Sequence, residues 1–213
     1  MGLFDQNCKK HELSLIANRE YLHTFKPFMY VHIPKTAGTS ILRSGLISIG
    51  DWADHKIAKD IKNISKYYSF TFIRNPYDKV YSSYNYYLSG KHSEEEKRSY
   101  LRDNFPTFEE FILNYDTSKH VNNYHFNTTQ KQYITNSKGD VIVDYVGDFY
   151  NVNKGFKKVQ ELNPINYGQV FNLPIENKTN KPIINVTDEM ANIIYNHWRE
   201  DFDFFNFSKN SYK

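Results

Sequence analysis

A lysine and several small or hydroxylated residues lie between two apolar segments near the start of the sequence. Residues 28–33 (FMYVHI) are mostly apolar, and Pro34 and the string KTAGTS follow them. A helix that begins in such a string presents unpaired backbone N–H groups and a partial positive charge, which attract phosphate or sulfate. A lysine adds a full charge and hydroxyls add hydrogen-bond donors. We therefore predict an anion site made by Lys35, Thr36, Ala37, Gly38, Thr39 and Ser40.

This string differs from the phosphate-binding loop of nucleoside-triphosphate kinases. That motif requires G-x-x-x-x-G-K-[ST], whereas Lys35 here precedes the single glycine, Gly38. The difference counts against a kinase. Residues 34–40 taken alone are equally compatible with an ordinary strand-to-helix turn that carries an exposed lysine.

A second segment repeats the arrangement and favours the anion site. Residues 67–73 (YYSFTFI) form another apolar run, and Arg74 follows it. Ser82 lies eight residues further on, and positions eight apart on or near a helix return to roughly the same side. A guanidinium and a hydroxyl could thus hold one phosphate from two directions. Two anion sites on neighbouring loops indicate a ligand with two separated anionic groups.

The order of elements around these loops predicts an α/β fold. Two successive strand-turn-helix units imply parallel strands joined by crossovers, so both loops should lie at the same edge of one sheet. We expect a helix from about Thr39 that carries Ile41 to Ile47, and a helical stripe of isoleucines over residues 51–64. A tyrosine-rich helix should follow Arg74.

The second half of the chain gives further local predictions. Charged residues 90–104 indicate a solvated loop, and Thr107 with Glu110 forms a capping box that opens a short helix. Residues 131–147 predict two strands around an Asn/Gly turn. A long helix should begin after Thr187, its N-cap.

Length and composition suit one globular domain with a local anion site. The chain has 213 residues, which we interpret as a single domain over 1–213. A net charge of +3 and one cysteine, Cys8, argue against a nucleic-acid-coating surface and against an internal disulfide. No apolar run approaches the ~20 residues of a membrane span, and no signal peptide is recognisable. We expect a cytoplasmic protein of prokaryotic or viral origin.

At the two loops the chain resembles a known family. HIPKTAGTS resembles the 5'-phosphosulfate loop, and FTFIRNPYDKVYSSY the 3'-phosphate motif, of sulfotransferases that use 3'-phosphoadenosine 5'-phosphosulfate (PAPS). The likeness is to carbohydrate sulfotransferases of the heparan and chondroitin type. Weaker likeness extends it over about residues 28–207, through the segments DHKIAKDI, YHFNTTQKQY, VDYVGDFYNVNKGFKKV and DFDFFNF. The resemblance implies one domain with a central parallel sheet flanked by helices, similar to the P-loop NTPases.

The resemblance also implies a mechanism and a set of ligands. Sulfuryl transfer to an alcohol is an in-line displacement that positioning and fixed positive charge can accelerate, with no metal required. Lys35 would neutralise the bridging oxygen of the leaving nucleotide, 3'-phosphoadenosine 5'-phosphate (PAP). The loop from Ala37 to Ser40 would hold the 5' phosphate, whereas Arg74 and Ser82 would hold the 3' phosphate. The expected acceptor is a saccharide or glycoconjugate hydroxyl.

The acceptor hydroxyl needs a general base, and histidine suits this role near pH 7. His55 is the first candidate and His125 the second, with Gln130 or Gln132 as acceptor-binding groups. Asp54 is a third possible base. His32 precedes the loop within the first strand, which favours a packed, hydrogen-bonded core histidine.

Two other functions remain open from the sequence. The first is a nucleotide kinase or other phosphoryl transferase on a related fold, and the second is a catalytically silent nucleotide-binding protein. Tyr150 occupies a position at which relatives usually carry Glu, and this departure keeps the silent protein in consideration.

Overall fold

The structure is a computed structural model that describes residues 26–89, 95–115, 124–162, 170–174 and 185–212. The chain divides into two compact units. The described residues within 1–74 and 130–178 form the first unit, and those within 75–129 and 179–213 form the second. The expectation of one domain over the whole chain stays a prediction.

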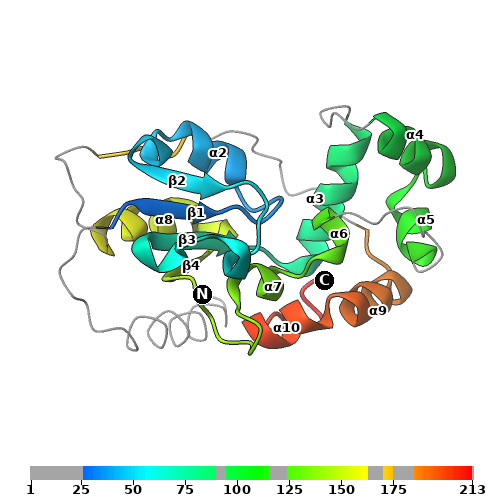
Figure 1. Cartoon of the computed structure of the whole chain (residues 1–213). Coiled ribbons are helices and arrows are strands. Elements are labelled where there is room, and N and C mark those ends of the chain that lie inside the picture. The colour runs from blue at the N-terminus through cyan, green and yellow to red at the C-terminus, as the bar shows by residue number, and fades with distance from the viewer. Residues whose placement is uncertain (1–25, 90–94, 116–123, 163–169, 175–184, 213) are drawn as a thin grey trace. The chain divides into compact units, whose positions relative to one another are not determined.

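The first unit contains a four-stranded parallel sheet. Its strands are β1 (Phe28–Val31), β2 (Gly50–Ala53), β3 (Tyr68–Ile73) and β4 (Tyr145–Asp148), in the spatial order β2-β1-β3-β4 (Figure 1). Every neighbouring pair is parallel. The predicted α/β class with a central parallel sheet is therefore confirmed, as are the two apolar runs predicted to be strands.

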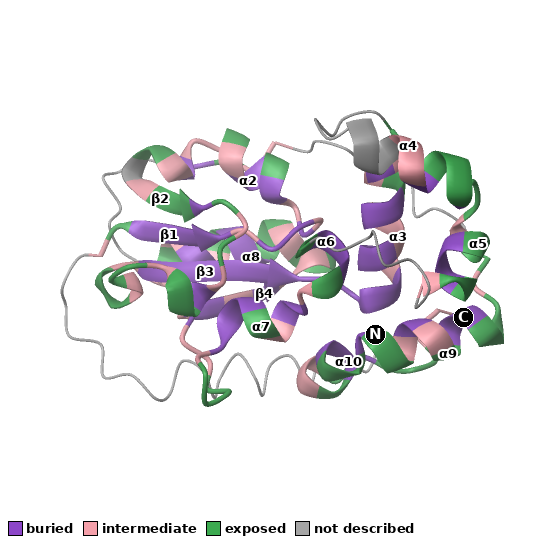
Figure 2. Ribbon diagram, turned by 45° about the vertical axis from the view of Figure 1, so that its right-hand side comes forward, coloured by how far each residue is buried: buried purple, intermediate pink, exposed green. Residues whose placement is uncertain are grey.

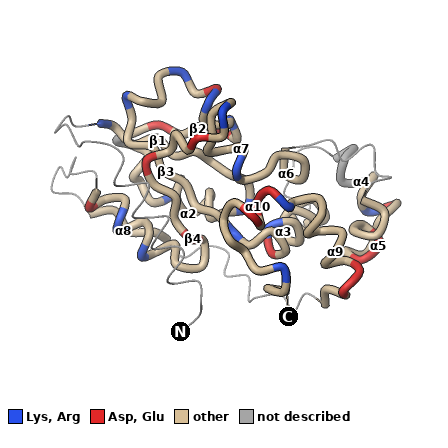
Figure 3. The backbone as a smooth tube through the Cα atoms, turned by 90° about the horizontal axis from the view of Figure 1, so that it is seen from below, with Lys and Arg blue, Asp and Glu red and all other residues tan. Residues whose placement is uncertain are grey.

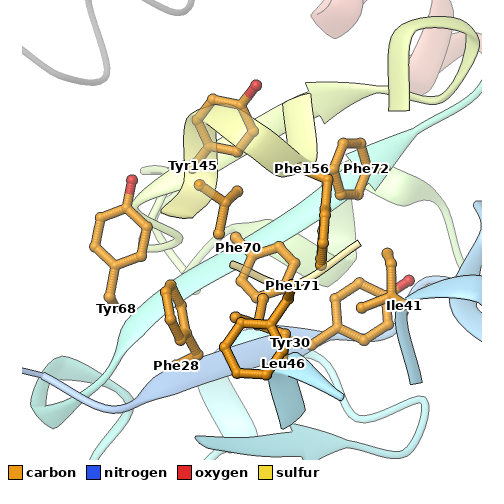
Figure 4. Packing of buried hydrophobic residues seen from close by; sticks show 11 residues of the cluster. Phe28, Tyr30, Ile41, Leu46, Tyr68, Phe70, Phe72, Tyr145, Phe156 and Phe171 are labelled. Atoms are coloured by element: carbon orange, nitrogen blue, oxygen red, sulfur yellow. The ribbon is translucent and has the colours of Figure 1, made fainter. Parts of the chain in front are cut away.

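Aromatic side chains on one face of this sheet form its core. Alternate residues of a strand share a face, and Phe28, Tyr30, Phe70 and Phe72 contribute rings to one cluster (Figure 4). Helix α2 (Gly38–Arg43) and helix α8 (Val152–Leu162) cover this face with Ile41, Phe156 and Val159. β1 and β3 are buried along their whole length (Figure 2). Burial on both faces explains why these strands are continuous apolar runs.

Helix α2 is shorter than the sequence predicts. It ends at Arg43, and a separate 3-10 helix, η1, spans Leu46–Ile49. Gly45 between them has a φ of 83°, a left-handed conformation that glycine adopts without steric cost. The break lets Leu46 turn into the aromatic core together with Ile41.

The predicted helix over residues 51–64 is wrong. Residues 50–53 form the edge strand β2, and only two 3-10 turns follow, η2 (Ala58–Asp60) and η3 (Ile64–Lys66). His55 and Asn63 have positive φ angles of 54° and 59°, which no right-handed helix tolerates. These residues form a strand because they pair with β1. Sequence periodicity carries no information about such a long-range contact.

The prediction of two strands over residues 131–147 is confirmed only in part. Gln130–Ile134 form helix α7, and the predicted hairpin is reduced to one antiparallel bridge between Thr135 and Val141. The second run does contain β4. A 3-10 helix, η5 (Phe149–Asn151), then leads into α8.

The described part of the second unit is helical. It contains α3 (Pro76–Leu88), α4 (Glu95–Asn104), α5 (Phe108–Leu113), α6 (Tyr124–Asn127), α9 (Asp188–His197) and α10 (Arg199–Phe205). The helix after Arg74, the capping box at Thr107 and the N-cap at Thr187 are confirmed. The loop predicted at 90–104 is wrong for 95–104, and the last helix is broken at Trp198. No helix of the described residues is both long enough and apolar enough to cross a membrane.

Candidate active site

The backbone of the loop after β1 has an unusual conformation. Lys35 and Ala37 both adopt left-handed φ angles, 66° and 75°, although neither is glycine. Such residues cost of order 1–3 kcal/mol each and cluster at functional sites. Alternation of left- and right-handed residues turns successive N–H groups toward one side and forms an anion-binding concavity. Two left-handed residues flank Thr36 in this loop, an arrangement compatible with such a concavity.

Helix α2 begins within this loop and supplies further donors. Its first helical hydrogen bond runs from Ile41 N–H to the carbonyl of Ala37 at 3.1 Å. The amides of Gly38, Thr39 and Ser40 therefore have no acceptor within the helix. Thr39 is exposed, and Ser40 is buried.

The hydroxyl of Thr36 is engaged within the loop. It is fully buried and donates to the carbonyl of Ile33 at 2.9 Å. In this arrangement its proton stabilises the turn after β1 instead of pointing to a ligand. Of the hydroxyls expected to contact an anion, those of Thr39 and Ser40 remain the candidates.

The two predicted anion loops meet in the first unit. Arg74, at the carboxyl end of β3, donates from Nη1 to the backbone carbonyl of Lys35 at 3.2 Å. The Arg74 side chain is only 7% exposed. Parallel strands β1 and β3 are neighbours in the sheet, so the residues that follow them emerge at the same edge.

Two residues that we did not predict in this role hold Arg74 in place. Gln130 accepts a hydrogen bond from the Arg74 amide at 2.8 Å and donates to the Arg74 carbonyl at 2.7 Å. It is fully buried, so it positions Arg74 and does not reach an acceptor as we had expected. The Phe149 ring lies 4.3 Å from Arg74 Cζ, a cation–π contact. The sequence did draw attention to Gln130, through its place in the segment YHFNTTQKQY. Nothing in the sequence pointed to Phe149.

His55 lies in a bend after β2, next to Asp54. Its Nδ1 is 3.0 Å from the carbonyl of His32, and its Nε2 is 3.6 Å from Asp54 Oδ1. A carbonyl only accepts hydrogen bonds, so Nδ1 of the neutral ring carries the hydrogen and Nε2 carries the lone pair. Nε2 is the nitrogen that can accept a proton.

His32 connects His55 to the loop. Its ring centroid lies 4.1 Å from that of His55 and 5.4 Å from that of Tyr30. A Cβ at Gly38 would lie 1.9 Å from Nε2 of His32, so glycine is needed here to make room for the ring. The His32 ring therefore occupies the Cβ side of Gly38.

Burial keeps His32 neutral. It lowers the pKa of His32 to about 3, with smaller contributions from the charges of His55 and Lys35. Nδ1 of His32 is buried and has no hydrogen-bond partner among the described residues. We expected a packed, hydrogen-bonded histidine: the ring is packed, but this nitrogen is unsatisfied.

The remaining predicted residues lie in the second unit. Ser82 is partly buried on α3. His125 is 4% exposed on α6, its ring stacks on Tyr86 at 5.5 Å, and its carbonyl accepts from Lys79 Nζ at 3.1 Å. The pairing of Ser82 with Arg74 and the role of His125 as a base stay predictions.

The first unit thus brings the predicted anion loop, with Lys35 and Arg74, together with the imidazole of His55. Over the described residues, Lys and Arg are interspersed with Asp and Glu (Figure 3). The positive charge available to an anionic ligand therefore comes from individual residues such as Lys35 and Arg74. This combination can bind an anionic group and remove a proton from a nearby hydroxyl.

Comparison with known proteins gave one match. A family model described as "Sulfotransferase family" matches residues 22–208, which include both loops and His55. Searches of curated proteins and of solved structures returned no significant match.

Proposed function

Because the chain belongs to the sulfotransferase family, we propose that it moves a sulfuryl group from PAPS to a hydroxyl of a carbohydrate or glycoconjugate. The family match supports sulfuryl transfer in general, and members of the family generally use PAPS as the donor. The carbohydrate acceptor is proposed from the likeness of the two loop motifs to carbohydrate sulfotransferases.

One observation supports the donor site above all. The hydrogen bond of 3.2 Å between Arg74 Nη1 and the Lys35 carbonyl brings the two anion loops together. PAPS carries its two anionic groups on one nucleotide, at the 5' and 3' positions, and needs two cationic loops that are close to each other. Loops far apart would exclude this donor.

The loop residues then have distinct roles in the proposed reaction. The amides of Gly38, Thr39 and Ser40 bind the 5' phosphate, and Arg74, together with Ser82, binds the 3' phosphate. Lys35 neutralises the charge that develops on the bridging oxygen as the S–O bond breaks. Donors that are fixed before the reaction need no reorganisation, which makes them effective in the transition state.

His55 is the proposed general base. Its Nε2 lone pair accepts the proton of the acceptor hydroxyl as the oxygen attacks sulfur, and PAP leaves from the opposite side. The hydrogen bond from Nδ1 to the His32 carbonyl fixes the tautomer that this step requires. Asp54, 3.6 Å from Nε2, can stabilise the imidazolium that forms.

An exposed aromatic ring near the base supports a sugar acceptor. Trp52 is 37% exposed, and its ring centroid lies 5.9 Å from that of His32. Ring faces of this kind offer a flat apolar surface, on which the apolar face of a sugar can pack.

Isothermal titration tests the donor assignment. We expect the full chain to bind PAP in buffer that contains a chelator and no magnesium, and Arg74→Ala to weaken this binding roughly a hundredfold. Lys209→Ala is a matched control, because Lys209 is an exposed cation of the second unit. Tighter binding of ATP with magnesium than of PAP would overturn sulfotransfer and favour a phosphoryl transferase.

An assay of sulfate transfer distinguishes an enzyme from a catalytically silent nucleotide-binding protein. Labelled sulfate donor is supplied together with a panel of saccharide acceptors. Transfer of the label to a saccharide supports the proposal if this transfer requires Lys35. Binding of PAP without transfer to any saccharide would overturn the carbohydrate acceptor.

A further inference from the structure

Three side chains next to the loop form a donor set that suits a divalent metal ion. One ligand atom from each of His32, Asp54 and His55 lies within 4.8 Å of the other two. Among the described residues, this is the one group of three or more histidines, cysteines and acids so arranged. Two imidazole nitrogens and one carboxylate oxygen are ligands that Zn²⁺ binds readily.

The hydrogen bonding of His55 is that of a metal ligand. Histidines that bind metals usually donate their other ring N–H to a carbonyl or a carboxylate, which fixes the ring and the tautomer. Nδ1 of His55 makes such a bond to the His32 carbonyl at 3.0 Å. Its Nε2 therefore presents a lone pair, with Asp54 Oδ1 already 3.6 Å away.

His32 supplies the third donor from a rigid position. Its ring contacts the rings of Tyr30 and His55, and Gly38 packs against its Nε2 side. Its Nδ1 is buried and has no hydrogen-bond partner among the described residues. Buried polar atoms in native proteins usually have at least one such partner. The carboxylate of Asp54 is 68% exposed, so the third side of the group is open to solvent and to an incoming ion.

We propose that His32, Asp54 and His55 bind a Zn²⁺ ion, and that this ion inhibits the enzyme by occupying Nε2 of His55. The inhibition rests on the proposed function, because one lone pair cannot bind a metal and accept a proton at once. The metal is a regulator here and is not needed for sulfuryl transfer. Lys35 adds a positive charge nearby, so binding should be weaker than in structural zinc sites and reversible by a chelator.

Competition with a chromophoric chelator tests the site without any activity assay. The full chain is stripped of metal and titrated with zinc chloride, next to Asp54→Asn and His32→Gln. We expect both variants to weaken one zinc site by roughly tenfold or more. Asp54 is exposed, so its variant should fold normally, and circular dichroism checks this. His197→Ala is the matched control, since His197 is an exposed histidine on α9, and its affinity should equal that of the wild type.

The outcomes separate the metal site from the proposed function. Equal zinc affinity in the wild type, Asp54→Asn and His32→Gln would overturn the site, and any bound zinc would then belong elsewhere in the chain. Zinc that binds through these residues but leaves sulfate transfer unchanged would overturn the inhibition. Zinc that binds through them in a protein that fails to bind PAP would support the site and overturn the proposed function alone.

Discussion

The guanidinium of Arg74 donates from Nη1 to the backbone carbonyl of Lys35 at 3.2 Å. This bond joins the residue after β3 to the residue after β1, two strands that are neighbours in the parallel sheet. A side chain from one loop therefore stabilises the left-handed backbone of the other. The two loops therefore lie close together in the first unit, and changes in either should affect the binding of a ligand that contacts both.

Lys35→Ala should reduce turnover far more than nucleotide affinity. The ammonium is proposed to act on charge that develops only as the S–O bond breaks, and loss of such a contact typically costs 10²–10³ in rate. Measurement of kcat and of PAP affinity on the same preparation checks this. Lys35→Arg keeps the charge but changes its geometry, so its kcat should lie between those of the wild type and Lys35→Ala. An alanine variant with wild-type kcat would remove Lys35 from the mechanism.

His55→Ala should lose turnover and keep PAP binding. The base acts on the acceptor, whereas the nucleotide is held by the loops, so the two properties should separate. His125→Ala is the informative comparison, because His125 is the second candidate base and is buried among tyrosines in the second unit. An active His55 variant together with an inactive, folded His125 variant would transfer the role to His125.

Gln130→Ala should weaken PAP binding although Gln130 is not proposed to touch the nucleotide. The side chain makes two hydrogen bonds to the backbone of Arg74, and without them the guanidinium loses its fixed position. We expect an effect smaller than that of Arg74→Ala, roughly tenfold. Gln132→Ala, on the same helix α7, serves as a control and should bind PAP as the wild type does. Unchanged affinity in Gln130→Ala would contradict the positioning role.

Gly38→Ala should destabilise the fold through His32. The added Cβ would lie 1.9 Å from Nε2 of His32, and overpacking of this kind typically costs about 1–3 kcal/mol. The double variant Gly38→Ala with His32→Ala removes the clashing ring, so the cost of the glycine change should fall in that background. Urea unfolding of all four proteins completes the cycle. Additive free energies of unfolding would show that the two residues do not contact.

His32 should make stability depend on pH below about 6.5. Its pKa is near 3 in the folded protein and near 6.5 when unfolded, so between these values the unfolded chain binds the extra proton. Stability is therefore complete well above the unfolded pKa and falls as the pH falls through it, by about 2 kcal/mol in total once the pH reaches 5. His32→Gln should show a shallower decline over that interval. Equal slopes for the variant and the wild type would contradict the assigned pKa.

The sequence alone determined the strands β1 and β3, their parallel pairing and the position of the loops that follow them. Each depends on local order: an apolar run that ends at Pro34 or Arg74, a helix start, and strands buried on both faces. The tertiary structure decided what surrounds those loops. Residues 50–53 became a strand because they pair with β1, and the bend after them set His55 against the His32 carbonyl. Gln130 reached Arg74, and Gly38 made room for His32. Such contacts join residues far apart in the chain or depend on side-chain direction, and neither periodicity nor motif spacing encodes them.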